Sequence, residues 1–187
     1  MMVTLETIDY KSTAPDTRST MTVRGDKNIT AGDRLHLERF VPYRLAVLSN
    51  IVSMSIAQAY AREFSLTIPE WRVIAVLARF PNLSAIEVAE RGAMDKVAVS
   101  RAVQSLLASR RLLRGFDKGD RRRSILRLSA AGRAVYTRVA PVALSYEKRL
   151  LDPLSSSDRR ALDRLIGLLI DRARELEPAA GTAAGRP

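Results

Sequence analysis

Apolar positions follow helical spacing over most of the chain. From Tyr43 to Phe64, two apolar series recur at steps of three and four residues, one over 45–59 and the other over 47–54. A helix with so few polar positions around its circumference needs cover on two sides. One cover is the chain's own core, and the simplest second cover is another copy of the chain. Before this helix, Asp33 can cap a short helix that we expect to end near Phe40, because Pro42 is unsuited to a helix interior.

Capping residues predict the shorter helices that follow. Thr67 is an N-cap and Pro69 occupies the first turn of a helix that carries Trp71 on its apolar stripe and ends before Pro81. Ser84 and Glu87 form a capping box that begins a second short helix.

Two helices joined by about four residues indicate a helix-turn-helix. The first is expected to stop at Gly92, and Asp95 caps the second. We expect one apolar stripe where the two helices face each other, formed by Ile86, Ala89, Val99, Val103, Leu106 and Leu107.

A change to strand spacing follows the second of these helices. The runs LLRGF and SILRL are prone to form β-strands, and DKGDRRR separates them, with Gly119 near its tip. The pattern predicts a hairpin in which Leu126 and Leu128 point inward and Arg127 points outward.

Two long helices are predicted at the end of the chain. Ser129 and Gly132 lead into a helix over 133–151, and Ser155 with Asp158 caps the next one. The apolar stripe of that last helix, over 162–176, requires a partner helix.

Charge and composition restrict the function. The net charge is +11, and residues 91–133 hold twelve basic and three acidic residues, which is +9 of that total. Such a balance favours an anionic partner such as nucleic acid. The chain has no cysteine, only one histidine (His36), and no GxSxG, Walker A or GxGxxG motif. We therefore expect no enzyme activity, no metal site and no cofactor.

Hydropathy gives an expectation about location. No apolar run approaches the ~20 residues of a membrane span, and the first residues lack a basic segment followed by an apolar one. We expect a cytoplasmic protein without a membrane partner.

These elements together resemble the MarR family of bacterial winged-helix transcription regulators, from about Leu35 to Leu176. The most specific segments are LTIPEWRVIAVLA, AERGAMDKVAVSRAVQSL and DKGDRRRSILRLSAAGR, and the last is similar to the family's D-x-x-D-R-R followed by a strand, a capping Ser/Thr and Gly. Two positions depart from the pattern: Arg111 stands where relatives usually have Gly, and Val97-Ala98 replace a common Ser-Thr.

The expected fold class is mainly α with a small β-hairpin wing: a winged helix-turn-helix lobe with long N- and C-terminal dimerisation helices. The predicted parts are a flexible tail (1–32), N-terminal dimerisation helices (33–65), a DNA-binding lobe (66–132), C-terminal dimerisation helices (133–176) and a second flexible tail (177–187).

The resemblance implies an obligate homodimer that binds double-stranded DNA at two half-sites of a pseudo-palindrome. It also implies a repressor that a small aromatic or phenolic acid releases from DNA. The candidate effector contacts are Tyr43, Arg44 and Trp71, although core packing is the favoured role of Trp71 because it lies on an apolar stripe.

The candidate DNA contacts lie on the second helix of the helix-turn-helix and on the hairpin tip. They are Lys96, Val97, Ser100, Arg101, Gln104, Arg121, Arg122 and Arg123. Because alternate residues of a hairpin face opposite sides, the three arginines cannot all point the same way. One is expected in the minor groove and another in an ion pair with Asp117 or Asp120, which shape the loop together with Gly119. The alternative function is a non-specific nucleic-acid-binding or architectural protein without an effector.

Overall fold

The chain divides into two units, Met1–Phe40 and Val41–Pro187, and the computed structural model describes residues 35–117 and 119–176. In the first unit, Leu35–Phe40 contain a turn in which the amides of Arg39 and Phe40 donate to the carbonyl of His36, at 3.0 Å each. The prediction of a short helix that ends near Phe40 is therefore wrong for these residues, which form a turn instead. The predicted tails, 1–32 and 177–187, lie outside the described residues.

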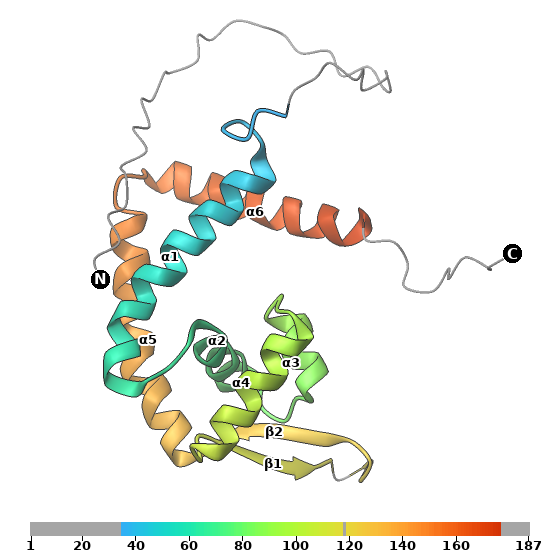
Figure 1. Cartoon of the computed structure of the whole chain (residues 1–187). Coiled ribbons are helices and arrows are strands. Elements are labelled where there is room, and N and C mark those ends of the chain that lie inside the picture. Colours follow the sequence, from blue (N-terminus) through green and yellow to red (C-terminus); the bar gives the residue numbers. More distant parts are fainter. Residues whose placement is uncertain (1–34, 118, 177–187) are drawn as a thin grey trace, which may run out of the picture. The chain divides into compact units, whose positions relative to one another are not determined.

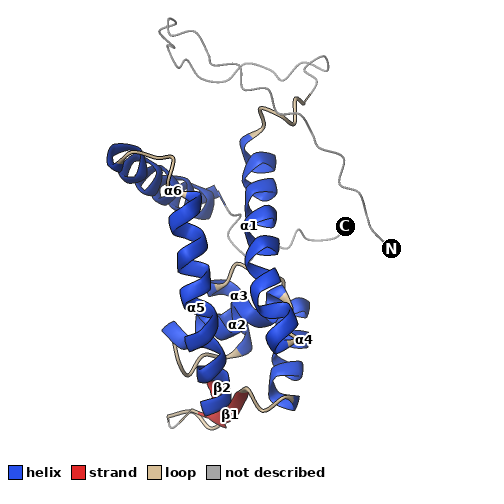
Figure 2. Ribbon diagram, turned by 90° about the vertical axis from the view of Figure 1, so that its left-hand side faces the viewer, coloured by secondary structure: helices blue, strands red, loops and turns tan. Residues whose placement is uncertain are grey.

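The described part of the second unit is helical except for one hairpin, which confirms the predicted fold class (Figures 1 and 2). Its elements are α1 (Val41–Phe64), α2 (Ile68–Arg79), α3 (Ala85–Arg91), α4 (Lys96–Ala108), β1 (Leu112–Phe116), β2 (Ser124–Leu128), α5 (Ala130–Leu150) and α6 (Ser156–Leu176). Helix α5 begins three residues before the predicted start at Arg133, because Ser129 is itself the N-cap and accepts a hydrogen bond from the amide of Gly132.

One apolar core joins the end of α1 with α2, α3, α4, the hairpin and the first half of α5. Its members with at most 2% exposure are Tyr60, Val73, Ile74, Leu77, Val88, Val99, Val103, Leu106, Leu112, Leu126 and Val139. Each large side chain buried in this way contributes about 1.5–3 kcal/mol. The core fixes α4 and the hairpin as parts of one body.

One predicted core residue of the helix-turn-helix is wrong. Ile86 is 58% exposed, whereas Val88 and Ala89 are buried. Successive residues of an α-helix are about 100° apart, so burying Val88 turns Ile86 to the opposite side of this short helix.

The hairpin is antiparallel, with Leu112 opposite Leu128 and Gly115 opposite Ile125. Leu126 and Leu128 are buried and Arg127 is exposed, as predicted. Strand β2 is also tied to the segment before α3, because the amide of Leu126 donates to the carbonyl of Leu83 at 2.8 Å.

Helices α1 and α5 pack against each other and extend away from the hairpin (Figure 2). Arg138 on α5 forms an ion pair with Glu63 on α1. Helix α6 follows α5 and buries none of its residues within the chain. Exposed apolar side chains on α1 and α6 include Leu45, Leu48, Ile51, Met54, Leu162, Leu165, Ile166, Leu169 and Leu176. No helix within the described ranges is long and apolar enough to cross a membrane.

Candidate nucleic-acid interface

Helix α4 carries the first group of predicted contact residues. Asp95 is its N-cap, and one carboxylate oxygen of Asp95 accepts hydrogen bonds from the amides of Val97 and Ala98 at 2.9 Å each. The first amides of a helix have no hydrogen-bond partner within the helix. The Asp95 side chain supplies one, which fixes where α4 begins.

The two faces of α4 differ sharply. Val99, Ala102, Val103 and Leu106 are buried against the lobe. The five predicted contact residues, Lys96, Val97, Ser100, Arg101 and Gln104, are all exposed. They recur at steps of three and four residues, so they share the outer face of the helix. The structure thus presents all of them to solvent on one side.

The turn between α3 and α4 is tight. Gly92 ends α3 with ordinary helical dihedral angles, and a Cβ at this position would lie 2.5 Å from the Cε of Met94 and 3.0 Å from the carbonyl oxygen of Val88. A larger residue would have to displace the flexible end of the Met94 side chain and press against the Val88 carbonyl. The left-handed residue of the turn is Ala93, with φ of 46°.

Helix α4 ends without a glycine. Ser109 is the C-cap and Arg110 has φ of 55°, so an arginine adopts the conformation that glycine favours. Arg111, the first departure from the family pattern, instead uses its guanidinium to donate to the carbonyl of Phe64 at 2.7 Å, which joins the end of α4 to the end of α1.

Acidic side chains shape the loop of the hairpin, as predicted. Asp117 accepts a hydrogen bond from the amide of Gly119 at 2.8 Å, and Asp120 accepts one from the amide of Arg122 at 2.9 Å. Backbone hydrogen bonds from Gly119 and Asp120 lower the pKa of Asp117. Both carboxylates therefore stabilise the loop.

Arg121, Arg122 and Arg123 do not have equivalent surroundings. The guanidinium of Arg123 lies 2.5 Å from Glu87 and 3.7 Å from Asp117. The predicted pairing of one arginine with Asp117 is therefore present. Arg121 and Arg122 are exposed and form no ion pair with any described residue.

Two residues of this surface were missed by the sequence analysis. Glu87 was expected only as a capping residue, and its pairing with Arg123, 36 positions later, has no local sequence signal. Arg114 is exposed on β1 and lines a small cavity with Arg123 beside the first residues of α3. In the sequence, only the position of Arg114 on the same hairpin as the arginine run indicated that it belongs to this surface.

The candidate effector residues do not form one site within the chain. The Trp71 ring stacks on Tyr136 and is tilted relative to Tyr60, with ring centroids 6.1 and 5.7 Å away, respectively. It is only partly exposed and packs on the core, as favoured from the sequence. Tyr43 and Arg44 are exposed near the start of α1. Seventeen residues separate Tyr43 from Tyr60, which is about 25 Å along a helix, so Tyr43 and Trp71 are far apart.

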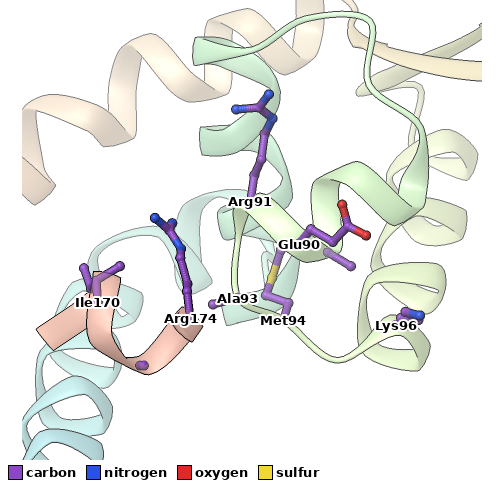
Figure 3. A pocket seen from close by; sticks show the side chains of 9 residues that line it. Glu90, Arg91, Ala93, Met94, Lys96, Ile170 and Arg174 are labelled. Atoms are coloured by element: carbon purple, nitrogen blue, oxygen red, sulfur yellow. The ribbon is translucent and has the colours of Figure 1, made fainter. Parts of the chain in front are cut away.

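A cavity of about 890 Å³ lies between the helix-turn-helix and α6 (Figure 3). Its lining residues are Ala89, Glu90, Arg91, Ala93, Met94, Lys96, Ile170, Ala173 and Arg174. The charged groups of Glu90, Arg91, Lys96 and Arg174 project in different directions in Figure 3. They do not converge on a single position for a small anion.

His36, the one histidine, is exposed. Within residues 35–117 and 119–176, no three histidine or acidic residues are grouped so that they could hold a metal ion.

Residues 64–123 match the MarR family model. The fold is that of solved regulators, among them a MarR/EmrR family transcriptional regulator from Acinetobacter sp. ADP1 (24% identity, TM-score 0.70, 76% of this chain and 100% of that one). A second is BpsR from Bordetella bronchiseptica, whose DNA binding is regulated by 6-hydroxynicotinic acid (22% identity, TM-score 0.65, 74% and 99%). A third is S. aureus MepR in complex with DNA (16% identity, TM-score 0.65, 73% and 98%). No curated protein sequence gives a match.

The family match covers the helix-turn-helix and the arginine run, and the fold of these solved regulators extends over the helices on either side. Residues 64–123 are therefore similar to the MarR family, and the chain has the fold of solved MarR-family transcriptional regulators.

Proposed function

We propose that this regulator binds a pseudo-palindromic DNA operator as a homodimer, represses transcription, and is released by a small aromatic or phenolic acid. The observation that carries the proposal is the outer face of α4, where five predicted contact residues are exposed on one side of a capped, rigidly packed helix. An exposed helix with this composition fits the major groove of B-DNA.

Within α4, the side chains suit two tasks. Arg101 and Gln104 can form paired hydrogen bonds with guanine and adenine edges, respectively. Lys96 and Ser100, nearer the start of the helix, suit phosphate contacts that fix the register. Val97, which is 56% exposed, offers methyl groups to a thymine methyl.

The wing adds a second contact. Arg121 and Arg122 are exposed at the end of a hairpin whose loop is held by two aspartates. Arginine side chains are well suited to a narrow minor groove, where the negative potential is strongest. Helix α4 and β1 pack together in one lobe, so the two contacts are made by one body.

The homodimer is supported by the uncovered apolar faces of α1 and α6. Both are long helices with many exposed leucine and isoleucine side chains. A monomer rarely exposes apolar patches of this kind, and a second copy of the chain would cover them. Two lobes related by a two-fold axis would then meet half-sites about 10 bp apart.

The acid effector is inferred from a protein of the same fold and from two exposed side chains on α1. BpsR, a protein with the same fold, responds to 6-hydroxynicotinic acid. In this chain, Arg44 could pair with a carboxylate and Tyr43 could contact the ring, since both are exposed on α1. The packing of Trp71 against the core leaves it a structural role. A thermal-shift screen of aromatic acids tests this point, because a ligand at 100 times its Kd stabilises its target by about 2.7 kcal/mol.

The experiment that tests the function selects duplexes from a random pool and then measures the affinity of the protein for the selected duplex and for its scrambled version. We expect a palindromic selected site, and a loss of about 1–3 kcal/mol of discrimination at one base pair in Arg101→Ala. Arg62→Ala removes the same charge from α1 and should leave the preference intact. Equal affinity for selected and scrambled DNA would instead indicate the alternative, a non-specific nucleic-acid-binding protein.

A further inference from the structure

Arg123 differs from its two neighbours because it is held within the chain. Its guanidinium lies 2.5 Å from Oε1 of Glu87 on α3 and 3.7 Å from Oδ2 of Asp117. About 41% of the Arg123 side chain and 34% of the Glu87 side chain are exposed. Among the described residues, Arg121 and Arg122 form no comparable pair.

Glu87 is a fixed partner because its other oxygen is already bound. Oε2 of Glu87 accepts a hydrogen bond from the amide of Ser84 at 2.8 Å, and the amide of Glu87 donates to Oγ of Ser84 at 3.3 Å. These are the two bonds of the capping box that begins α3. The carboxylate therefore joins the first turn of α3 on one side and the wing on the other.

The charge of Glu87 persists at physiological pH. The hydrogen bond from Arg123, followed by the bond from the Ser84 amide, lowers the pKa of Glu87 to about 2. The same partnership raises the pKa of Arg123.

The backbone of Arg123 closes the hairpin loop. The amide of Asp117 donates to the carbonyl of Arg123, and the amide of Arg123 donates to the carbonyl of Asp120, at 3.0 Å each. The side chain thus ties the loop end of the hairpin to α3. A second tie, between Leu126 on β2 and Leu83 just before α3, lies three residues after Arg123, about 10 Å away. Together the two ties hold the end of the loop and β2 beside the start of α3.

We propose that Arg123 is a positioning residue: its ion pair with Glu87 clamps the wing to α3, and the wing contacts DNA through Arg121 and Arg122. The proposal rests on the DNA-binding function above. The competing interpretation is that Arg123 contacts a phosphate, in which case Glu87 competes with DNA for its guanidinium.

Glu87→Gln separates these interpretations by the sign of its effect. Glutamine also serves in a capping box, so α3 keeps its start, while the ion pair with Arg123 is lost. The net charge becomes more positive by one, which by itself favours DNA binding. The clamp nevertheless predicts a weaker affinity, by roughly two- to fivefold as for an exposed ion pair. Stronger binding of Glu87→Gln would overturn the proposal.

Salt dependence gives a second, independent test on a mixed-sequence duplex of about 30 bp, three helical turns. Losing a phosphate contact lowers the slope of log K against log salt concentration by about one unit. We expect this drop in Arg122→Gln, the matched control, and an unchanged slope in Arg123→Gln. The double variant Glu87→Gln/Arg123→Gln should bind no more weakly than either single variant. A drop of about one unit in Arg123→Gln would assign it a DNA contact and refute the clamp.

Hydrogen exchange in the free protein decides the clamp without DNA. The amide of Asp117 donates to the carbonyl of Arg123, so a loosened wing should exchange this proton faster in Glu87→Gln than in the wild type. An unchanged exchange rate contradicts the clamp. Failure of the wild-type protein to bind any duplex would refute the proposed function instead.

Discussion

Gly132→Ala tests the junction between the wing and α5. Gly132 is buried in the first turn of α5, and a Cβ added there would lie 2.1 Å from the carbonyl oxygen of Arg111 and 3.1 Å from its carbon. Real Cβ contacts essentially never fall below 3.0 Å, so the backbone must move by roughly 1 Å. The same carbonyl accepts hydrogen bonds from the amide and the hydroxyl of Ser129, at 3.0 Å each.

The expected loss follows from three contributions. Overpacking costs about 1–3 kcal/mol, and weakening one hydrogen bond costs about 1 kcal/mol. Replacing glycine by alanine inside a helix returns about 1 kcal/mol. We therefore expect Gly132→Ala to lower the free energy of unfolding by about 2 kcal/mol.

Urea unfolding at fixed protein concentration measures this change. Gly115→Ala is the matched control, because its new Cβ would lie 3.9 Å from the nearest atom, on Ile125, and its stability should stay equal to or slightly above the wild type. Equal midpoints for Gly132→Ala and the wild type would refute the packing described for this junction.

Three further predictions address the dimer, the clamp and the end of α4. Leu169→Glu places a charge on the exposed apolar face of α6. Sedimentation should show that this variant is a monomer at a concentration where the wild type is a dimer. An unchanged dimer would place the interface elsewhere. The pKa of Glu87 is about 2 in the folded protein and about 4.3 in the unfolded chain. The contribution of Glu87 to stability is therefore present above pH 4.3 and disappears as the pH falls toward 2. Thermal unfolding of Glu87→Gln across this pH range should lack that pH dependence. Arg110→Gly relieves a left-handed arginine with φ of 55° and should raise the free energy of unfolding by up to about 1 kcal/mol, whereas a loss would show that the Arg110 side chain stabilises the turn.

Local signals in the sequence were sufficient for most elements of the lobe. The N-cap at Thr67, the capping box at Ser84 and the cap at Asp95 lie where they were predicted, because each depends on residues within three positions. The alternation of Leu126, Arg127 and Leu128 likewise placed the inner face of β2. The exposure of Ile86 was missed because a seven-residue helix is too short for its apolar period to define a face.

Features that depend on distant contacts could not be predicted from local patterns. The pairing of Arg123 with Glu87 needs the fold to bring two segments together, and the sequence offered Asp117 or Asp120 as nearer partners. The use of Arg111 to bind the carbonyl of Phe64 has the same origin, since 47 positions separate the two residues. Propensity and spacing describe neighbours along the chain, whereas these interactions depend on tertiary packing.

In the proposed complex, a dimer presents two copies of α4 and the wing to successive grooves on one face of a duplex. Hydroxyl-radical footprinting of the protein on its selected duplex tests this arrangement. We predict two protected regions about 10 bp apart, each flanked by minor-groove protection that disappears in an Arg121→Gln/Arg122→Gln variant. A single protected region, or even protection along the whole duplex, would contradict it.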